Sequence, residues 1–116
     1  MRRAVKSLVL RTGFLVSLWT GVTSAAAADA VMIQKFAFVP REITIAPGAT
    51  VQWTNKDETP HTISATDRGF VSKALDTDDH YEHTFVNEGD YSYFCTLHPF
   101  MTGVVHVRAA AAAGGK

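Results

Sequence analysis

Cys95, His98 and Met101 place a thiol, an imidazole and a thioether three residues apart, just after a run of aromatic residues. Soft sulfur donors together with imidazole favour copper over calcium, magnesium or manganese. A long and weak axial thioether bond is typical of copper sites that transfer electrons. Such a site needs a second imidazole, and His61 lies upstream after another strand-like run. The sequence therefore predicts one copper ion bound by these four side chains.

Cys95 is the only cysteine of the chain, so it has no partner for an internal disulfide. A lone cysteine is more often buried and inert, but a histidine and a methionine at fixed short spacing favour a metal ligand here. The thiolate of Cys95 would form the strongest bond, His61 and His98 would complete a trigonal plane, and Met101 would be the axial ligand that tunes the potential. Four ligands leave no open position for substrate, which argues against an enzyme.

The elements that must position these ligands are short strands, because apolar residues alternate with a period of two from Val31 onward. Seven or eight strands separated by turns predict an all-β, two-sheet antiparallel sandwich. Alternation places Tyr91, Tyr93 and Cys95 on one side of a strand. If the tyrosine rings face the interior, the thiolate of Cys95 faces it as well. Tyr91 is either a tyrosine corner, whose hydroxyl bonds to the backbone across the turn, or an ordinary core aromatic residue. The predicted strands lie near 31–38, 42–46, 50–55, 61–65, 69–73, 81–86, 90–95 and 103–108.

Residues 1–30 have the features of a cleavable export signal: a basic start, a short apolar stretch and an alanine-rich region. Cleavage is expected after Ala28 or Ala30, and the alternative is an uncleaved anchor. The apolar stretch is too short for a comfortable membrane span. Residues 31–108 then form one domain without a membrane span, and the alanine- and glycine-rich tail 109–116 is expected to be disordered.

Outside the signal, seven basic and ten acidic residues leave a net charge near −3. Lysine and arginine do not cluster, so a nucleic-acid partner is not expected, and we expect a monomer. Acidic residues do gather with two histidines in the segment 76–83. This segment would either bind a second metal, steer a basic partner, or, more simply, form a solvated loop and strand edge. The residues concerned are Asp76, Asp78, Asp79, His80, Glu82 and His83.

The ligand pattern and its surroundings, from about Ile33 to Val107, resemble the cupredoxins, the small blue copper proteins. The two-residue gaps of Cys95-x-x-His98-x-x-Met101 look most like those of the amicyanins. The resemblance implies a Greek-key sandwich, one type 1 copper ion and a periplasmic carrier of single electrons. By the same resemblance, the donor would be an amine dehydrogenase, the acceptor would be a c-type cytochrome, and His98 would leave Cu(I) on protonation at low pH.

The resemblance also implies residues around the ligands. Asn55 is expected to tie the two ligand loops together, and the amide of Thr62 to donate to the thiolate of Cys95. Thr62 departs from the family pattern, since most relatives carry asparagine there, and Leu97 replaces a proline that amicyanins often have.

Four apolar residues are expected to form a collar around a partly exposed edge of His98. This collar is a candidate docking site for redox partners. The alternative is that these residues only shape the loop and pack inward. They are Pro60, Leu97, Pro99 and Phe100.

Two other functions compete with electron transfer. Copper delivery or storage usually relies on methionine-rich or cysteine-pair sites, whereas the chain beyond the signal has two methionines, Met32 and Met101, and one thiol. A sandwich for apolar binding or adhesion with no metal would make the order of the four donors a coincidence. Both are weaker interpretations than an electron carrier.

Overall fold

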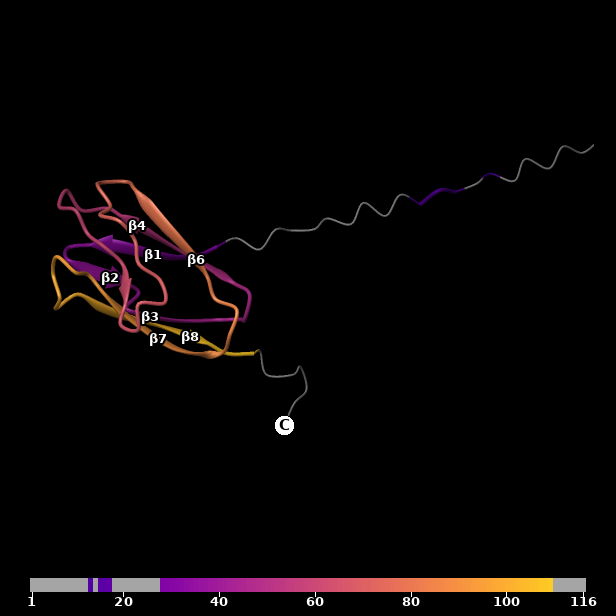
Figure 1. Cartoon of the computed structure of the whole chain (residues 1–116). Helices are drawn as coiled ribbons and strands as arrows, with labels where there is room; N and C mark the ends of the chain where they lie inside the picture. Colours follow the sequence, from indigo (N-terminus) through magenta and orange to yellow (C-terminus); the bar gives the residue numbers. More distant parts are fainter. Residues whose placement is uncertain (1–12, 14, 18–27, 110–116) are drawn as a thin grey trace, which may run out of the picture.

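The structure is a computed structural model that describes residues 13, 15–17 and 28–109. The described residues form eight strands in two four-stranded sheets, with strand orders β2-β1-β4-β6 and β3-β8-β7-β5 (Figure 1). The predicted all-β sandwich of two sheets is confirmed. The strands are β1 (Asp29–Gln34), β2 (Ala37–Val39), β3 (Glu42–Ile45), β4 (Thr50–Asn55), β5 (Ser64–Ala65), β6 (His80–Thr84), β7 (Gly89–Phe94) and β8 (Thr102–Val107).

The sheets are mixed rather than wholly antiparallel as expected. β1 pairs with β4 in parallel, and β3 pairs with β8 in parallel, while the other pairs are antiparallel. Parallel neighbours need a crossover connection. The chain provides one when it leaves the first sheet after β2, forms β3 in the second sheet and returns as β4. Alternation in a sequence reports which face is buried and carries no information on strand direction.

The strand expected near 31–38 is two strands joined by a tight turn. Gln34 pairs with Ala37, so Lys35 and Phe36 alone form the connection, with φ values of 51° and 57°. A two-residue hairpin with positive φ at both positions normally uses Asn-Gly or a similar pair. A left-handed conformation costs roughly 1–2 kcal/mol for each residue that carries a Cβ atom. Lys-Phe gives no turn signal, which explains why the sequence did not predict this turn.

The strands expected near 61–65 and 69–73 are mostly irregular. Only the two residues of β5 are a strand, and the second segment contributes a single bridge between Ser64 and Val71. His61 forms another isolated bridge, to Leu75. The polypeptide around His61 is therefore a loop held by separate contacts, not a continuous ladder.

The interior is aromatic and lies between the two sheets. Trp53 is fully buried, and its ring centroid lies 5.3 Å from that of Tyr93 and 6.0 Å from that of Phe70. Tyr93 packs directly on Gly103, where a Cβ atom would overlap the tyrosine ring. This contact holds β7 against β8 on either side of the loop that joins them. The Tyr91 hydroxyl donates to the carbonyl of Asn87 at 2.7 Å, as expected for a tyrosine corner.

The β1–β2 turn and the β7–β8 loop lie at the same end of the sandwich, on the left in Figure 1. We call this end the metal pole, defined by the turn at 35–36 and the loops 55–61 and 95–101. The predicted signal and tail lie largely outside the described residues, although Asp29 and Ala30 pair with Val51 and Gln52. Among the residues that are described, no helix is long and apolar enough to cross a membrane.

Candidate metal centre

Three of the predicted ligands come together at the metal pole. Donor atoms of His61, Cys95 and His98 all lie within 4.8 Å of one another. The Sγ atom of Cys95 is 3.8 Å from Nδ1 of His61 and 3.7 Å from Nδ1 of His98. In a trigonal plane with bonds of about 2.0 Å to nitrogen and about 2.3 Å to sulfur, sulfur and nitrogen are separated by about 3.7 Å. The donor set therefore fits a trigonally bound copper ion.

The β7–β8 loop explains the three-residue spacing of its ligands. Cys95 follows β7 directly and is fully buried, as the alternation along β7 predicted. The amide of His98 donates to the carbonyl of Cys95 at 3.2 Å, and that of Met101 donates to the carbonyl of His98 at 2.8 Å. The amide of Cys95 closes the loop on the carbonyl of Met101 at 3.0 Å. The two turns thus bring the three donors of the loop together, and Met101, 2% exposed, immediately precedes β8.

His61 is fully buried, and its ring is oriented by a carboxylate. Nε2 of His61 lies 2.9 Å from Oδ2 of Asp57. Since a carboxylate accepts, Nε2 carries the proton and Nδ1 remains free to bind a metal. Burial acts to raise the pKa of Asp57, but hydrogen bonds from Phe36, His61 and Lys35 outweigh it and lower the pKa. Asp57 was not predicted as part of the site, because its only signal in the sequence is its place four residues before His61.

Asn55 fixes the loop that carries His61. Its fully buried side chain donates to the carbonyls of Thr59 and Leu75, both at 2.9 Å, and accepts from the amide of Asp57 at 2.9 Å. These bonds all lie on the His61 side, and none of them reaches the β7–β8 loop. Asn55 ends β4 and faces the interior beneath residues 56–60, so the expected tie between the two ligand loops comes from another residue.

Thr62 provides that tie. Its amide lies 3.4 Å from Sγ of Cys95, the contact expected from the sequence. Its hydroxyl accepts from the amide of Thr96 at 2.8 Å and lies 2.8 Å from the Thr96 hydroxyl. An N–H directed at the sulfur helps to fix the position of a ligating side chain. Thr62, where the family resemblance led us to expect asparagine, therefore still supplies a side-chain bond between the loops.

The expected collar is exposed. Leu97 is 54% and Phe100 is 72% exposed, Pro60 and Pro99 are exposed as well, and His98 is half-buried among them. These side chains do not pack inward, as the alternative required. One further member of this surface, Phe36, was not predicted and is 43% exposed. Its ring centroid lies 5.3 Å from that of His61 and 5.1 Å from that of His98.

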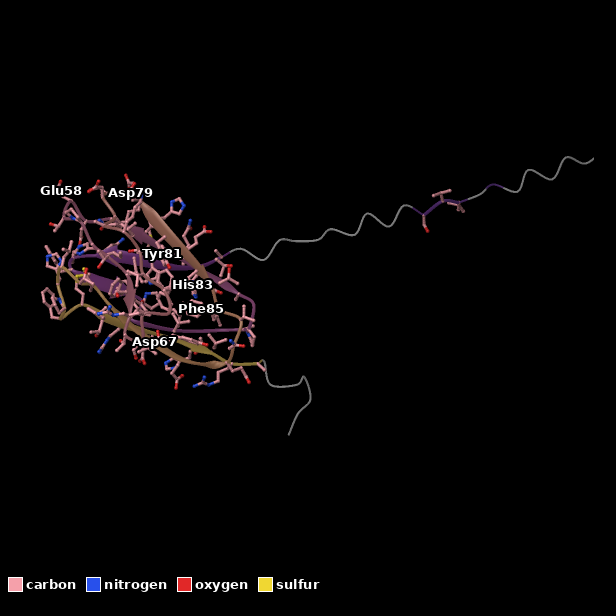
Figure 2. The ribbon with its side chains drawn as sticks, viewed as in Figure 1. Glu58, Asp67, Asp79, Tyr81, His83 and Phe85 are labelled. Carbon is pink, nitrogen blue, oxygen red and sulfur yellow. The ribbon has the colours of Figure 1, made fainter. Side chains whose placement is uncertain are left out.

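The acidic segment 76–83 does not assemble a second metal cluster of three or more histidine, cysteine or carboxylate groups within the described part of the chain. Figure 2 shows His83 between Tyr81 and Phe85. The His83 ring stacks on Phe70 with centroids 4.6 Å apart, and burial lowers the pKa of His83. Glu58 and Asp79 project from one corner of the molecule in Figure 2. This segment is thus a partly packed strand bordered by acidic groups.

Comparison with known proteins gives a consistent result. Residues 25–108 match the family described as copper binding proteins, plastocyanin/azurin family. Amicyanin from Paracoccus versutus is 39% identical over 87 residues, which cover 69% of this chain and 66%, just under two thirds, of that relative.

Solved structures agree with these matches. A purple cupredoxin from Nitrosopumilus maritimus superposes with a TM-score of 0.66 at 34% identity, covering 69% of this chain and 99% of the other. A copper-containing nitrite reductase from Thermus scotoductus superposes with a TM-score of 0.67 at 27% identity, but only 22% of that chain is covered.

Proposed function

The chain belongs to the plastocyanin/azurin family of copper-binding proteins, and from this premise we propose that it carries single electrons between redox proteins. The observation that carries the proposal is the triangle of donor atoms from His61, Cys95 and His98, with Met101 buried beside it. Copper bound there would alternate between Cu(II) and Cu(I).

The chain's own contribution is to hold the donors in one geometry. Asp57 orients the His61 ring, Thr62 ties the two ligand loops together, and backbone bonds close the loop from Cys95 to Met101. Ligands fixed by neighbouring residues on a rigid scaffold move little when the charge of the metal changes. Small movement makes electron transfer fast, which suits a carrier.

The collar supplies the place where electrons enter and leave. We propose that Pro60, Leu97, Pro99 and Phe100 form the docking surface around the exposed edge of His98, because exposed apolar groups at one pole are typical of interaction sites. By family resemblance, the donor would be an amine dehydrogenase and the acceptor a c-type cytochrome.

We further propose that the protein acts in the periplasm after removal of its export signal. Asp29 and Ala30 form the start of β1 and pair with β4. A cut after Ala28 would preserve this pairing, whereas a cut after Ala30 would remove it. Cleavage after Ala28 is therefore the form we expect.

The proposal excludes an enzymatic role for the protein by itself, because four protein ligands leave no position for a substrate. Although a nitrite reductase contains a domain of the same fold, only 22% of that enzyme is covered by this chain. Copper delivery is the second candidate. It is less favoured because His61 and Cys95 are both fully buried, which hinders transfer of the ion to another protein.

The test is to add one equivalent of Cu(II) to the mature protein and record its absorption and electron paramagnetic resonance spectra. An intense red-region band from thiolate to copper, with narrow hyperfine splitting and bleaching by ascorbate, is the expected result. Cys95→Ala should lose the band. A pale spectrum with wide splitting, or rapid loss of copper to a chelator, would turn the assignment towards copper handling.

A further inference from the structure

We propose that Phe36 is a positioning residue for the metal site: its ring holds the imidazoles of His61 and His98 in their ligating orientation. The inference rests on the proposed copper site. It concerns a residue outside the ligand set and outside the predicted collar.

The geometry of three rings supports this role. Phe36 meets His61 at an interplanar angle of 90° and His98 at 81°, with centroids 5.3 Å and 5.1 Å away. The two imidazoles lie 5.0 Å apart, so each ring contacts the other two. Edge-to-face contacts at these distances are attractive and depend on orientation. Rotation of either imidazole would break its contact with Phe36.

The backbone that presents this ring is strained. Lys35 and Phe36 both adopt left-handed φ values in a turn where glycine or asparagine would be favoured. Strained residues that persist in a fold often have a functional reason, and the surroundings must stabilise them. Here the carboxylate of Asp57 accepts both turn amides, from Lys35 at 2.7 Å and from Phe36 at 2.9 Å.

The same carboxylate links the turn to the metal site. Oδ2 of Asp57 accepts from Phe36 and from Nε2 of His61. The position of the Phe36 ring is therefore fixed relative to the His61 ring through a single group. Within the part of the chain that the structure describes, no carboxylate bonds to the His98 ring. The position of His98 in the exposed loop depends instead on backbone bonds and on neighbouring rings. We therefore expect the Phe36 ring to matter more for the orientation of His98 than for that of His61.

Phe36→Gly separates positioning from ordinary packing. Glycine adopts the left-handed conformation without a steric cost, so the thermal midpoint of the apoprotein should stay the same or rise. The copper-loaded variant should nevertheless release Cu(II) to EDTA roughly 10- to 100-fold faster, the usual consequence of losing a group that supports a metal ligand. Its hyperfine lines should broaden as His98 takes several orientations. Phe36→Tyr, which keeps the ring, should restore wild-type values.

Lys35→Gly is the matched control, because it relieves the same turn without touching either histidine ring. It should release copper at the wild-type rate. If Phe36→Gly behaved like wild type, or if Lys35→Gly changed the rate of copper release equally, the role of the Phe36 ring would be refuted.

Nuclear magnetic resonance relaxation of the apoprotein adds a readout without copper, in which the His98 ring should become more mobile only in Phe36→Gly. A wild-type protein without a blue spectrum would instead overturn the proposed function.

Discussion

The two loops that carry the histidine ligands are built in opposite ways. The loop before His61 is held by the buried Asn55 and the partly buried Asp57, which together bond to the backbone and to the imidazole. The loop around His98 is closed mainly by its own backbone and exposes its apolar side chains. One histidine is thus anchored in the fold, while the other faces the surroundings through which electrons would pass.

Removing the anchor of the first loop should have the largest effect. Asn55→Ala removes the donor of the Thr59 carbonyl and the acceptor of the Asp57 amide, and it leaves the Leu75 carbonyl with the His61 amide alone. We therefore expect a loss of about 3 kcal/mol in the free energy of unfolding. Denaturant titration of the apoprotein measures it. The exposed Asn87 offers a matched control, since Asn87→Ala should change stability by less than about 0.5 kcal/mol. Equal effects of the two variants would mean that the first loop is not anchored through Asn55.

The tie between the loops should be the next most sensitive element. Thr62→Val keeps the shape of the side chain but removes the acceptor for the Thr96 amide, at a cost of about 1–2 kcal/mol. Thr44→Val, at an exposed strand position, serves as control. We also expect the reduction potential to change in Thr62→Val alone, because the geometry around the thiolate shifts. An unchanged potential would show that the tie has no influence on the metal.

Changes in the second loop should affect exchange more than stability. Phe100→Ala should alter the free energy of unfolding by less than about 0.5 kcal/mol. It should slow electron self-exchange roughly fivefold, since truncating an anchor of an interface costs on the order of 1 kcal/mol. Val86→Ala removes a similarly exposed side chain from the loop between β6 and β7, outside the collar, and should leave the rate unchanged. A slower rate in both variants would argue against a collar-specific interface.

The smallest effect is expected far from both loops, where His106 on β8 bonds to Asp90 and Glu42. These two carboxylates raise the pKa of His106. A raised pKa in the folded state adds stability that is complete below the ordinary value of about 6.5 and is lost as pH rises through the folded value. The thermal midpoint of the wild type should therefore be higher than that of His106→Gln. The difference should be largest near pH 6 and should shrink towards pH 9. A constant difference would mean that the ion pairs contribute nothing.

The sequence revealed one loop better than the other. The donors of the second loop follow one another at three-residue intervals, so their spacing alone predicted a common site. The support of the first loop arises from residues distant in the chain, such as Leu75 and the turn at Phe36, and these contacts depend on how the sheets pack. Lys35-Phe36 has no turn signature, because this turn is stabilised by hydrogen bonds to the Asp57 carboxylate and not by a glycine in the turn itself. The direction of the strands could not be predicted either, because the alternation of apolar residues is the same in parallel and antiparallel strands.

The position of β8 has a consequence for the order of assembly. β8 is the last of the strands that the structure describes, and it inserts between β3 and β7 with the ligands of the second loop just before it. Its parallel pairing with β3 joins residues that are far apart in the chain, and such contacts form late in folding. The site is therefore complete only once the final strand has docked. The rate at which the copper absorption band appears during refolding would therefore report the last step of folding.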